Sequence, residues 1–172
     1  MANEPFVFSD DVKVSGDTRW LRRDEFDSYM ANWFQPVEVY ISGTPLIANS
    51  SQTTLDWTAE HFDPFSLHNP AVNPSRITIA KAGKYFVHAG IKFLSNATGT
   101  RILYLLKNGT IQLGIERSGT SVFDIVMLIH RQFDLAVGDY LQIAVFQNSG
   151  GDLTLYGAGQ YNAFFGAFRT GN

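Results

Sequence analysis

The stretch AGKYFVHAGIKFL at residues 82–94 decides the fold class of this chain. Its odd-numbered positions from 85 to 93 are all apolar, so an extended strand presents them together to a core. Its even-numbered positions include Phe86, His88 and Leu94, which is more apolar and aromatic than a solvated face requires. Because a strand of an isolated sandwich has one polar face, the stretch predicts a strand whose second face meets a further surface.

The same two-sided pattern recurs in two later segments. In residues 121–133 the odd positions are largely apolar, and the even positions include Val126 and Leu128. In residues 160–168 Phe164 lies on the face opposite a run of small and aromatic residues. The excess of apolar side chains predicts self-association, because a second copy of the chain is the simplest surface that could cover it.

From Pro36 onward the chain alternates short β-rich runs with turn residues and has no segment of helical periodicity. Asn108-Gly109 is a strong hairpin signal, and Gly138-Asp139 marks a second turn. Ten strands without connecting helices predict an all-β, antiparallel double-sheet fold. The candidate strands are 37–41, 53–57, 76–80, 84–94, 101–107, 111–116, 121–133, 140–147, 153–156 and 160–168.

Four segments resemble the landmarks of the C1q-like globular domain, which shares the jelly roll of tumour necrosis factor. They occur in family order over about residues 37–170, with no Gly-X-Y stalk and no counterpart to the first 36 residues. The resemblance implies a ten-stranded antiparallel jelly-roll sandwich that forms a compact homotrimer. The segments are AGKYFV at 82–87, LKNG at 106–109, FDL followed by VGDYL within 133–141, and AFFGAF at 163–168.

The resemblance also implies which face points at the threefold axis of that trimer. The face is the even-numbered side of the strand that contains Tyr85. The implied trimer-interface residues are Phe86, His88, Leu128, His130 and Phe164. Two readings of the histidines stay open: they could respond to pH at a buried seam, or they could be neutral side chains satisfied by hydrogen bonds.

Residues 1–36 form an arm that differs from the body at 37–172. The spacing of apolar residues at 26, 29, 30, 33 and 34 is helical, with Asp24 as the expected N-cap and Pro36 as the terminator. A helix of about eleven residues is marginal alone in water, so its aromatic face must dock either on its own domain or on a partner. The candidate anchor residues are Trp20, Leu21, Phe26, Tyr29, Met30, Trp33 and Phe34.

Charge and composition exclude several function classes. The 172 residues include 13 basic and 16 acidic side chains, and no Lys/Arg run supplies a nucleic-acid surface. No apolar run approaches the roughly 20 residues that span a bilayer, so no membrane role is expected. The chain has no cysteine, which removes disulfides, thiolate catalysis and cysteine-ligated zinc.

A search for catalytic or metal-binding patterns finds no nucleophile elbow, phosphate loop or HExxH motif. Glu60, His61, Asp63 and His68 form the one polar cluster that resembles a ligand set, and they could equally cap neighbouring strands. A glycosidase pair or a calcium site could be drawn from the aspartates, although two of them flank Gly138 as turn formers. We therefore expect no enzyme, no metal and no cofactor. The aspartates are Asp124, Asp134, Asp139 and Asp152.

The functional expectation is a non-enzymatic, trimeric structural or binding protein on the surface of a tailed-bacteriophage virion. It would be a capsid decoration, a head fibre or a tail-associated adhesin, held to capsid or tail proteins by residues 1–36 and able to bind a host-surface glycan or protein. Residues 1–8 lack a signal-peptide pattern, and phage structural proteins reach the outside by lysis. The alternative is a free bacterial C1q-like module that binds a sugar or a protein.

Overall fold

The computed structural model describes residues 12–13, 20–21, 23–118, 123–157 and 163–171. The chain divides into two compact units, Met1–Phe34 and Gln35–Asn172.

The first unit contains a short strand pair and a helix. Strand β1 (Val12–Lys13) pairs antiparallel with β2 (Trp20–Leu21), and α1 spans Arg23–Phe34. The expected N-cap position is wrong, because the helix begins at Arg23. Asp24 therefore lies within the first turn, where its carboxylate favours the positive end of the helix dipole. The helix ends at Phe34, before the proline, as the sequence predicts.

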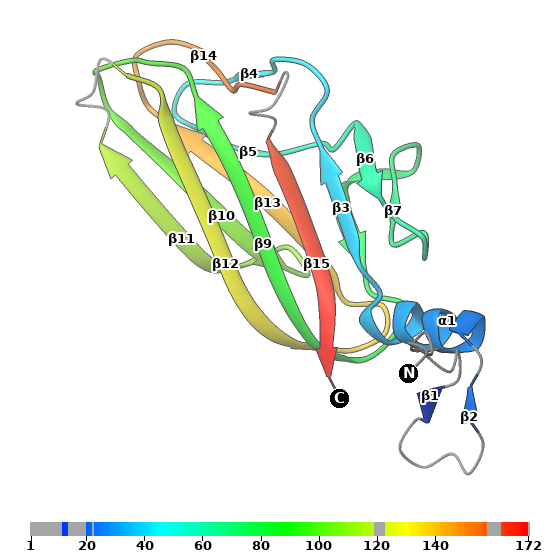
Figure 1. The fold of residues 1–172 in the computed structure, drawn as a ribbon. Coiled ribbons are helices and arrows are strands. Elements are labelled where there is room, and N and C mark those ends of the chain that lie inside the picture. Colours follow the sequence, from blue (N-terminus) through cyan, green and yellow to red (C-terminus); the bar gives the residue numbers. More distant parts are fainter. Residues whose placement is uncertain (1–11, 14–19, 22, 119–122, 158–162, 172) are drawn as a thin grey trace, which may run out of the picture. The chain divides into compact units, whose positions relative to one another are not determined.

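The second unit consists of two antiparallel sheets packed face to face (Figure 1). The β9 sheet has the order β12-β9-β15-β3-β6, and the β13 sheet has the order β11-β10-β13-β8-β7, with β5 also paired to β13. The β9 sheet contains β3 (Val37–Tyr40), β6 (Ala59–Phe62), β9 (Gly83–Phe93), β12 (Ile125–Leu135) and β15 (Phe164–Gly171). The β13 sheet contains β5 (Ser51–Thr54), β7 (His68–Asn69), β8 (Asn73–Thr78), β10 (Thr100–Lys107), β11 (Thr110–Ser118) and β13 (Tyr140–Gln147). A further pair joins β4 (Leu46–Ile47) and β14 (Leu153–Thr154).

This architecture confirms the predicted all-β, antiparallel double-sheet fold. The sequence did not predict β4, β6 or β7, since each is only two to four residues long and lacks an alternating apolar pattern. Strand β6 is held by backbone pairing to β3, with a register shift between Glu38 and Val39, and side-chain periodicity contributes no signal for it.

The core lies between the two sheets and is filled by the inward positions of each strand. In β9 these are the odd-numbered residues, from Tyr85 at 0% exposure to Phe93 at 0%. Trp57 packs against Phe165 across the core, with ring centroids 5.4 Å apart. The hydroxyl of Tyr85 donates a hydrogen bond to the carbonyl of Lys81 (2.8 Å), and burial raises the pKa of this phenol.

Two buried arginines support loops of the sandwich. Arg101 at the start of β10 donates to the carbonyls of Thr98 and Asn96, and burial lowers its pKa. Arg169 in β15 donates its Nε–H to the carbonyl of Ala82 (2.9 Å), just before β9 begins. Each buried guanidinium thus has N–H donors satisfied by backbone carbonyls of an adjoining loop.

Asp139 joins the β10–β11 hairpin to the turn before β13. Asn108 at φ 52° and Gly109 at φ 75° form the left-handed pair that a tight hairpin requires. The Nδ2 of Asn108 donates to Asp139 (2.7 Å), and the carboxylate also accepts bonds from Lys107 Nζ (2.8 Å) and the backbone N–H of Ala136 (2.8 Å). These donors, with Lys107 first, lower the pKa of Asp139 to about 2.

The substitution Asp139→Asn is expected to reduce the free energy of unfolding at pH 7 by about 2 kcal/mol. Because the folded-state pKa lies below the unfolded-state value, this stabilisation is present above about pH 4 and is lost as the pH falls towards about 2. Urea denaturation from pH 7 to pH 3 measures the difference between variant and wild type, which should shrink with acidification.

The matched control is Asp134→Asn, because Asp134 is 79% exposed and bonds only to Lys84 among the described contacts of its side chain. An exposed ion pair contributes little, so this variant should match the wild type within about 0.5 kcal/mol. Equal losses in both variants at every pH would contradict the role given to Asp139.

Candidate functional site

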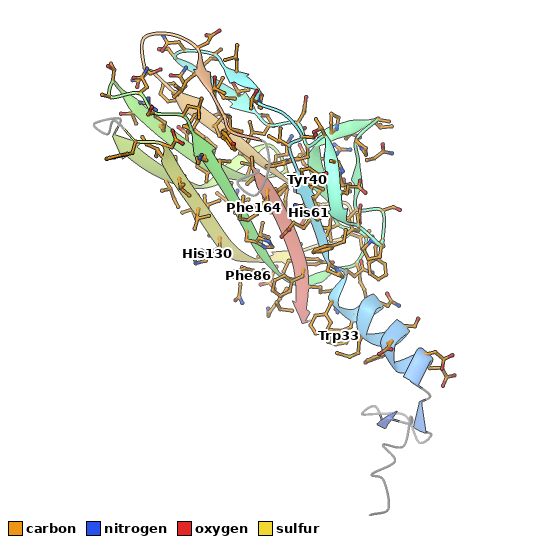
Figure 2. All side chains as sticks on the ribbon, turned by 45° about the horizontal axis from the view of Figure 1, so that its top comes forward. Trp33, Tyr40, His61, Phe86, His130 and Phe164 are labelled. Atoms are coloured by element: carbon orange, nitrogen blue, oxygen red, sulfur yellow. The ribbon has the colours of Figure 1, made fainter. Side chains whose placement is uncertain are left out.

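The candidate site is the outward face of the β9 sheet. On β12 the outward side chains of Val126 and Leu128 are 59% and 60% exposed, although both are aliphatic. We call this surface the seam face; it comprises Glu38, Tyr40, Phe86, His88, Val126, Leu128, His130, Phe164 and Phe168. All five residues predicted for an interface lie on it, on β9, β12 and β15. Figure 2 labels three of them, Phe86, His130 and Phe164.

Strand register aligns the seam face in two neighbouring rows. In the first row His130 pairs with His88, and His88 pairs with Gly166, which in turn pairs with Glu38. In the second row the register positions follow in the order Leu128, Gly90, Phe164 and Tyr40. Each row therefore crosses four strands and contains one glycine.

Phe86 is the centre of a ring cluster on this face. Its ring lies 5.9 Å from that of His130, 6.0 Å from that of His88 and 5.4 Å from that of Phe168. His88 extends the cluster to Phe164, with the ring centroids 5.9 Å apart. Contacts at these separations are favourable for aromatic pairs, and they form a broad apolar surface.

Gly166 allows His88 to reach across β15 to Glu38 on β3. The Nε2 of His88 lies 3.0 Å from Oε2 of Glu38, so this nitrogen donates its hydrogen to the carboxylate. A Cβ at position 166 would come within 2.8 Å of the imidazole, which shows that the ring lies over the glycine. The Nδ1 of His88 is buried and has no hydrogen-bond partner among the described residues.

Gly90 has the same role beneath Phe164. A Cβ at position 90 would come 2.4 Å from the Phe164 ring and 2.8 Å from Cδ2 of Leu128. The missing side chain lets the aromatic ring lie down on the sheet beside Leu128. The two glycines therefore flatten the seam face, since each supports a ring that an alanine would displace.

Sequence reasoning missed Glu38 and Tyr40 as members of this face. A signal for both was present, because Val37, Val39 and Ile41 alternate with Glu38 and Tyr40 in the sequence. A carboxylate on a mostly apolar face requires a partner, and a histidine two strands away is not visible from local spacing.

The polar cluster around His68 supports loops and strands by direct hydrogen bonds. Glu60 Oε1 lies 2.9 Å from His68 Nδ1, and the carbonyl of Pro74 lies 3.1 Å from Nε2. Asp63 accepts bonds from the backbone N–H groups of Leu67 (3.0 Å) and His68 (2.8 Å). Among the described residues, no group of three or more His, Cys, Asp or Glu side chains could hold a metal ion.

His61 lies apart from that cluster, stacked on Tyr40 with the ring centroids 4.4 Å apart (Figure 2). This contact extends the aromatic surface of the seam face from β3 to β6.

The predicted aspartates do not converge on a reaction site. Asp124 bonds Lys92 (2.9 Å) and the N–H of Ser95 (3.0 Å), and these donors lower its pKa. Ten residues of extended chain, roughly 30 Å, separate it from Asp134 near the other end of β12. Asp139 is engaged in the turn contacts given above, and Asp152 accepts a bond from the N–H of Asn49 (3.3 Å).

The candidate anchor residues belong to the first unit. Tyr29 and Phe34 are 42% and 39% exposed, and Tyr29 stacks on Trp33 with centroids 6.3 Å apart. Met30 and Trp33 are half-buried. Trp20 and Leu21 lie in β2 and Phe26 lies in α1, and the positions of their side chains are not described.

Comparison with known proteins gives one result for the sequence and another for the structure. No protein-family model matches the sequence, and no curated protein matches it. Several solved structures match the fold. Murine APRIL has a TM-score of 0.61 at 13% identity, over 80% of this chain and 99% of APRIL.

Two other structures give the same result. The globular domain of the zebrafish complement 1qA protein has a TM-score of 0.61 at 14% identity, over 80% of this chain and 99% of that domain. Eiger TNF from S. frugiperda has a TM-score of 0.58 at 15% identity, over 81% of this chain and 94% of the Eiger chain. The chain has the C1q/TNF-like jelly-roll fold. This confirms the predicted fold class, and at such identities the likeness concerns the fold alone.

No helix in the described part of the chain is long and apolar enough to cross a membrane.

The substitution Gly166→Ala is expected to separate His88 from Glu38. The added methyl would meet the imidazole at 2.8 Å and the carbonyl of Val37 at 2.9 Å, so we expect a loss of about 1–3 kcal/mol in unfolding free energy. Urea denaturation measures the loss, and the ¹⁵N shift of the His88 side chain reports the broken contact.

The matched control is Gly151→Ala, where an added Cβ meets nothing within 4 Å. It should leave stability within about 0.5 kcal/mol of wild type. An unchanged His88 resonance in Gly166→Ala would show that the imidazole does not depend on the glycine.

Proposed function

We propose that this chain is a non-enzymatic binding and structural protein that acts as a homotrimer, with the seam face as the contact between copies. The observation that carries the proposal is the exposure of Val126 and Leu128 beside the Phe86 ring cluster. Burying an aliphatic or aromatic side chain fully stabilises by about 1.5–3 kcal/mol, so covering this face in water is favourable.

The charge of the second unit supports association. Residues 37–172 hold nine basic and nine acidic side chains, so the unit has no net charge to oppose contact with a copy of itself. On the central rows of the seam face, Glu38 is already bonded to His88. Covering the face therefore does not bury an unpartnered carboxylate.

The fold supports an oligomer of three subunits. Proteins of the C1q and tumour necrosis factor type form homotrimers, and the jelly roll is shared with them. The five residues that the resemblance implies for a trimer interface are all among the nine residues of the seam face, which supports this face as the contact.

The engagement of the polar residues supports a non-enzymatic role. Asp124, Asp139, Glu60 and His68 each bond backbone groups or a structural side-chain partner. Such groups are held as supports and are not turned towards a shared substrate position.

We further propose that the first unit anchors the trimer to a larger assembly, namely capsid or tail proteins at a bacteriophage virion surface. The support for an anchor is a separate unit whose helix exposes the rings of Tyr29 and Phe34. The second unit would then project outward and bind a host-surface ligand in three copies, which raises affinity by multivalency.

The substitution Phe164→Asp is expected to convert the trimer into monomers. Phe164 is half-buried on the outward face, so the core of the subunit should survive while the seam receives an unpaired charge. Sedimentation velocity at micromolar concentration should show a 19.2 kDa species in place of one about three times larger.

The matched control is Leu46→Asp, since Leu46 is 65% exposed on β4, outside the seam face. It should remain trimeric. If the wild-type chain sediments as a monomer, or if the Phe164→Asp variant stays trimeric, the seam face is not the contact between copies.

Deletion of residues 1–36 is expected to leave a folded trimer that does not enter particles, because the second unit has its own core. Mass spectrometry of purified virions from a genome that encodes the truncated chain measures incorporation. Full incorporation would refute the anchor. A wild-type trimer with no affinity for capsids or tails would instead favour a free ligand-binding module.

A further inference from the structure

The outward face of the β13 sheet carries a second surface, on the opposite side of the sandwich from the seam face. In β10 and β13 the core residues Leu103, Leu105, Ile143 and Val145 alternate with residues that point away from the core. The outward set contains Ile102, Tyr104, Leu106, Ala144 and Phe146. The rings of Tyr104 and Phe146 are half-buried, so part of each remains open to solvent.

Strand register places polar neighbours beside these rings. Ile102 pairs with Phe146, which pairs with Gln52 of β5. In the adjacent row Tyr104 pairs with Ala144, which pairs with Thr54. We call this group the platform; it comprises Gln52, Thr54, Ile102, Tyr104, Ala144 and Phe146.

Tyr104 lies against the backbone of the neighbouring strand. Its register partner on β11 is Gly114, and a Cβ there would come 3.2 Å from both Cδ1 and Cε1 of the ring. The ring therefore covers the glycine with one side and keeps the other side towards solvent. Ala144, the register partner of Tyr104 on β13, is small and fully buried, so the other residues of the platform form its exposed part.

Three hydrogen-bonding groups at the platform have no partner among the described residues: the amide of Gln52, the hydroxyl of Thr54 and the hydroxyl of Tyr104. Gln52 and Thr54 are exposed, so water satisfies them in the free protein. Gln52 pairs with the half-buried Phe146, so a polar and an apolar contact are available within one residue spacing.

The platform is also electrically neutral. The nearest described cation on this outward face is Arg76, which pairs with Gln142 one row away and holds its guanidinium 4.9 Å from the ring of Tyr140; Arg101, beside Ile102, is buried. The residue in register with Ile102 on the other side is Glu116, an acidic residue. This charge distribution does not complement an acidic ligand.

We propose that the platform binds neutral carbohydrate. A pyranose ring has an apolar C–H face that stacks on an aromatic ring, and hydroxyl groups at its edge that exchange hydrogen bonds with amides and hydroxyls. Tyr104 and Phe146 supply the stacking surface, and Gln52 and Thr54 supply the edge contacts. The inference rests on the proposed ligand-binding role and assigns that role a surface and a ligand class.

The test is native affinity electrophoresis of the full chain in gels that contain dextran, mannan or galactan. At least one of these neutral polysaccharides should retard the wild type. Tyr104→Ala should weaken the retardation at least tenfold, because it removes the stacking surface. The double variant Gln52→Ala, Thr54→Val should also weaken it, and since both residues are exposed it should fold normally.

The matched control is Phe62→Ala, which removes a ring that is 46% exposed on β6 of the other sheet and should leave retardation unchanged. Competition with methyl pyranosides distinguishes recognition of a single sugar ring from recognition that requires a polymer. Competition at millimolar sugar supports a single-ring site. Resistance to every pyranoside, with platform-dependent retardation retained, supports a site that spans several sugars.

Three results would overturn the inference: no retardation by any of the three polysaccharides, retardation that the platform variants do not change, or binding only to acidic polysaccharides. Sedimentation of the same samples separates this failure from failure of the proposed trimer. A trimer without polysaccharide binding contradicts the platform alone. Binding by Phe164→Asp monomers, measured with the pyranoside, supports the platform even where the seam contact is absent.

Discussion

The two-residue period of an extended strand is the constraint on which the rest of this structure depends. It sends alternate side chains of β9, β12 and β15 to opposite faces of one sheet; the inward set is apolar, and the outward set is rich in aliphatic and aromatic side chains. The inward set already fills the core against the β13 sheet. The outward set has no such cover within the described part of its own unit, so the exposure of Val126 and Leu128 is a consequence of the sequence and not of a loosely packed core.

Glycine gives both outward faces the same local geometry. Gly90 and Gly166 lie beneath Phe164 and His88 on the β9 sheet, and Gly114 lies beneath Tyr104 on the β13 sheet. A ring that lies over a glycine covers backbone, and the surface above it stays low. Larger residues at these positions would lift the rings and produce a rough surface that packs poorly. On both sheets of the sandwich, therefore, aromatic rings lie over glycines.

The sequence was sufficient to predict what depends on local pattern. Alternation in residues 84–94 predicted β9 and its two faces, and Asn108-Gly109 predicted the β10–β11 hairpin with its two positive φ angles. It was insufficient for contacts that cross the sheet. Glu38 and His88 are 50 residues apart and meet only because Gly166 separates them in register, and no local spacing carries that information. The sequence predicted Asp24 as the N-cap because aspartate is common at that position, whereas α1 begins at Arg23 and Asp24 lies within its first turn.

The two faces differ in the chemistry that can cover them. The seam face combines exposed aliphatic side chains with an imidazole and a carboxylate that already bond each other, so few of its polar groups need new partners when water leaves. The platform combines rings with an amide and hydroxyls that have no described protein partner. A purely apolar contact would therefore bury these groups without hydrogen bonds. A dry protein contact therefore suits the first face, and a hydroxyl-rich ligand suits the second. Because the faces belong to different sheets of one sandwich, occupation of one leaves the other open, and three joined copies would present three platforms at once.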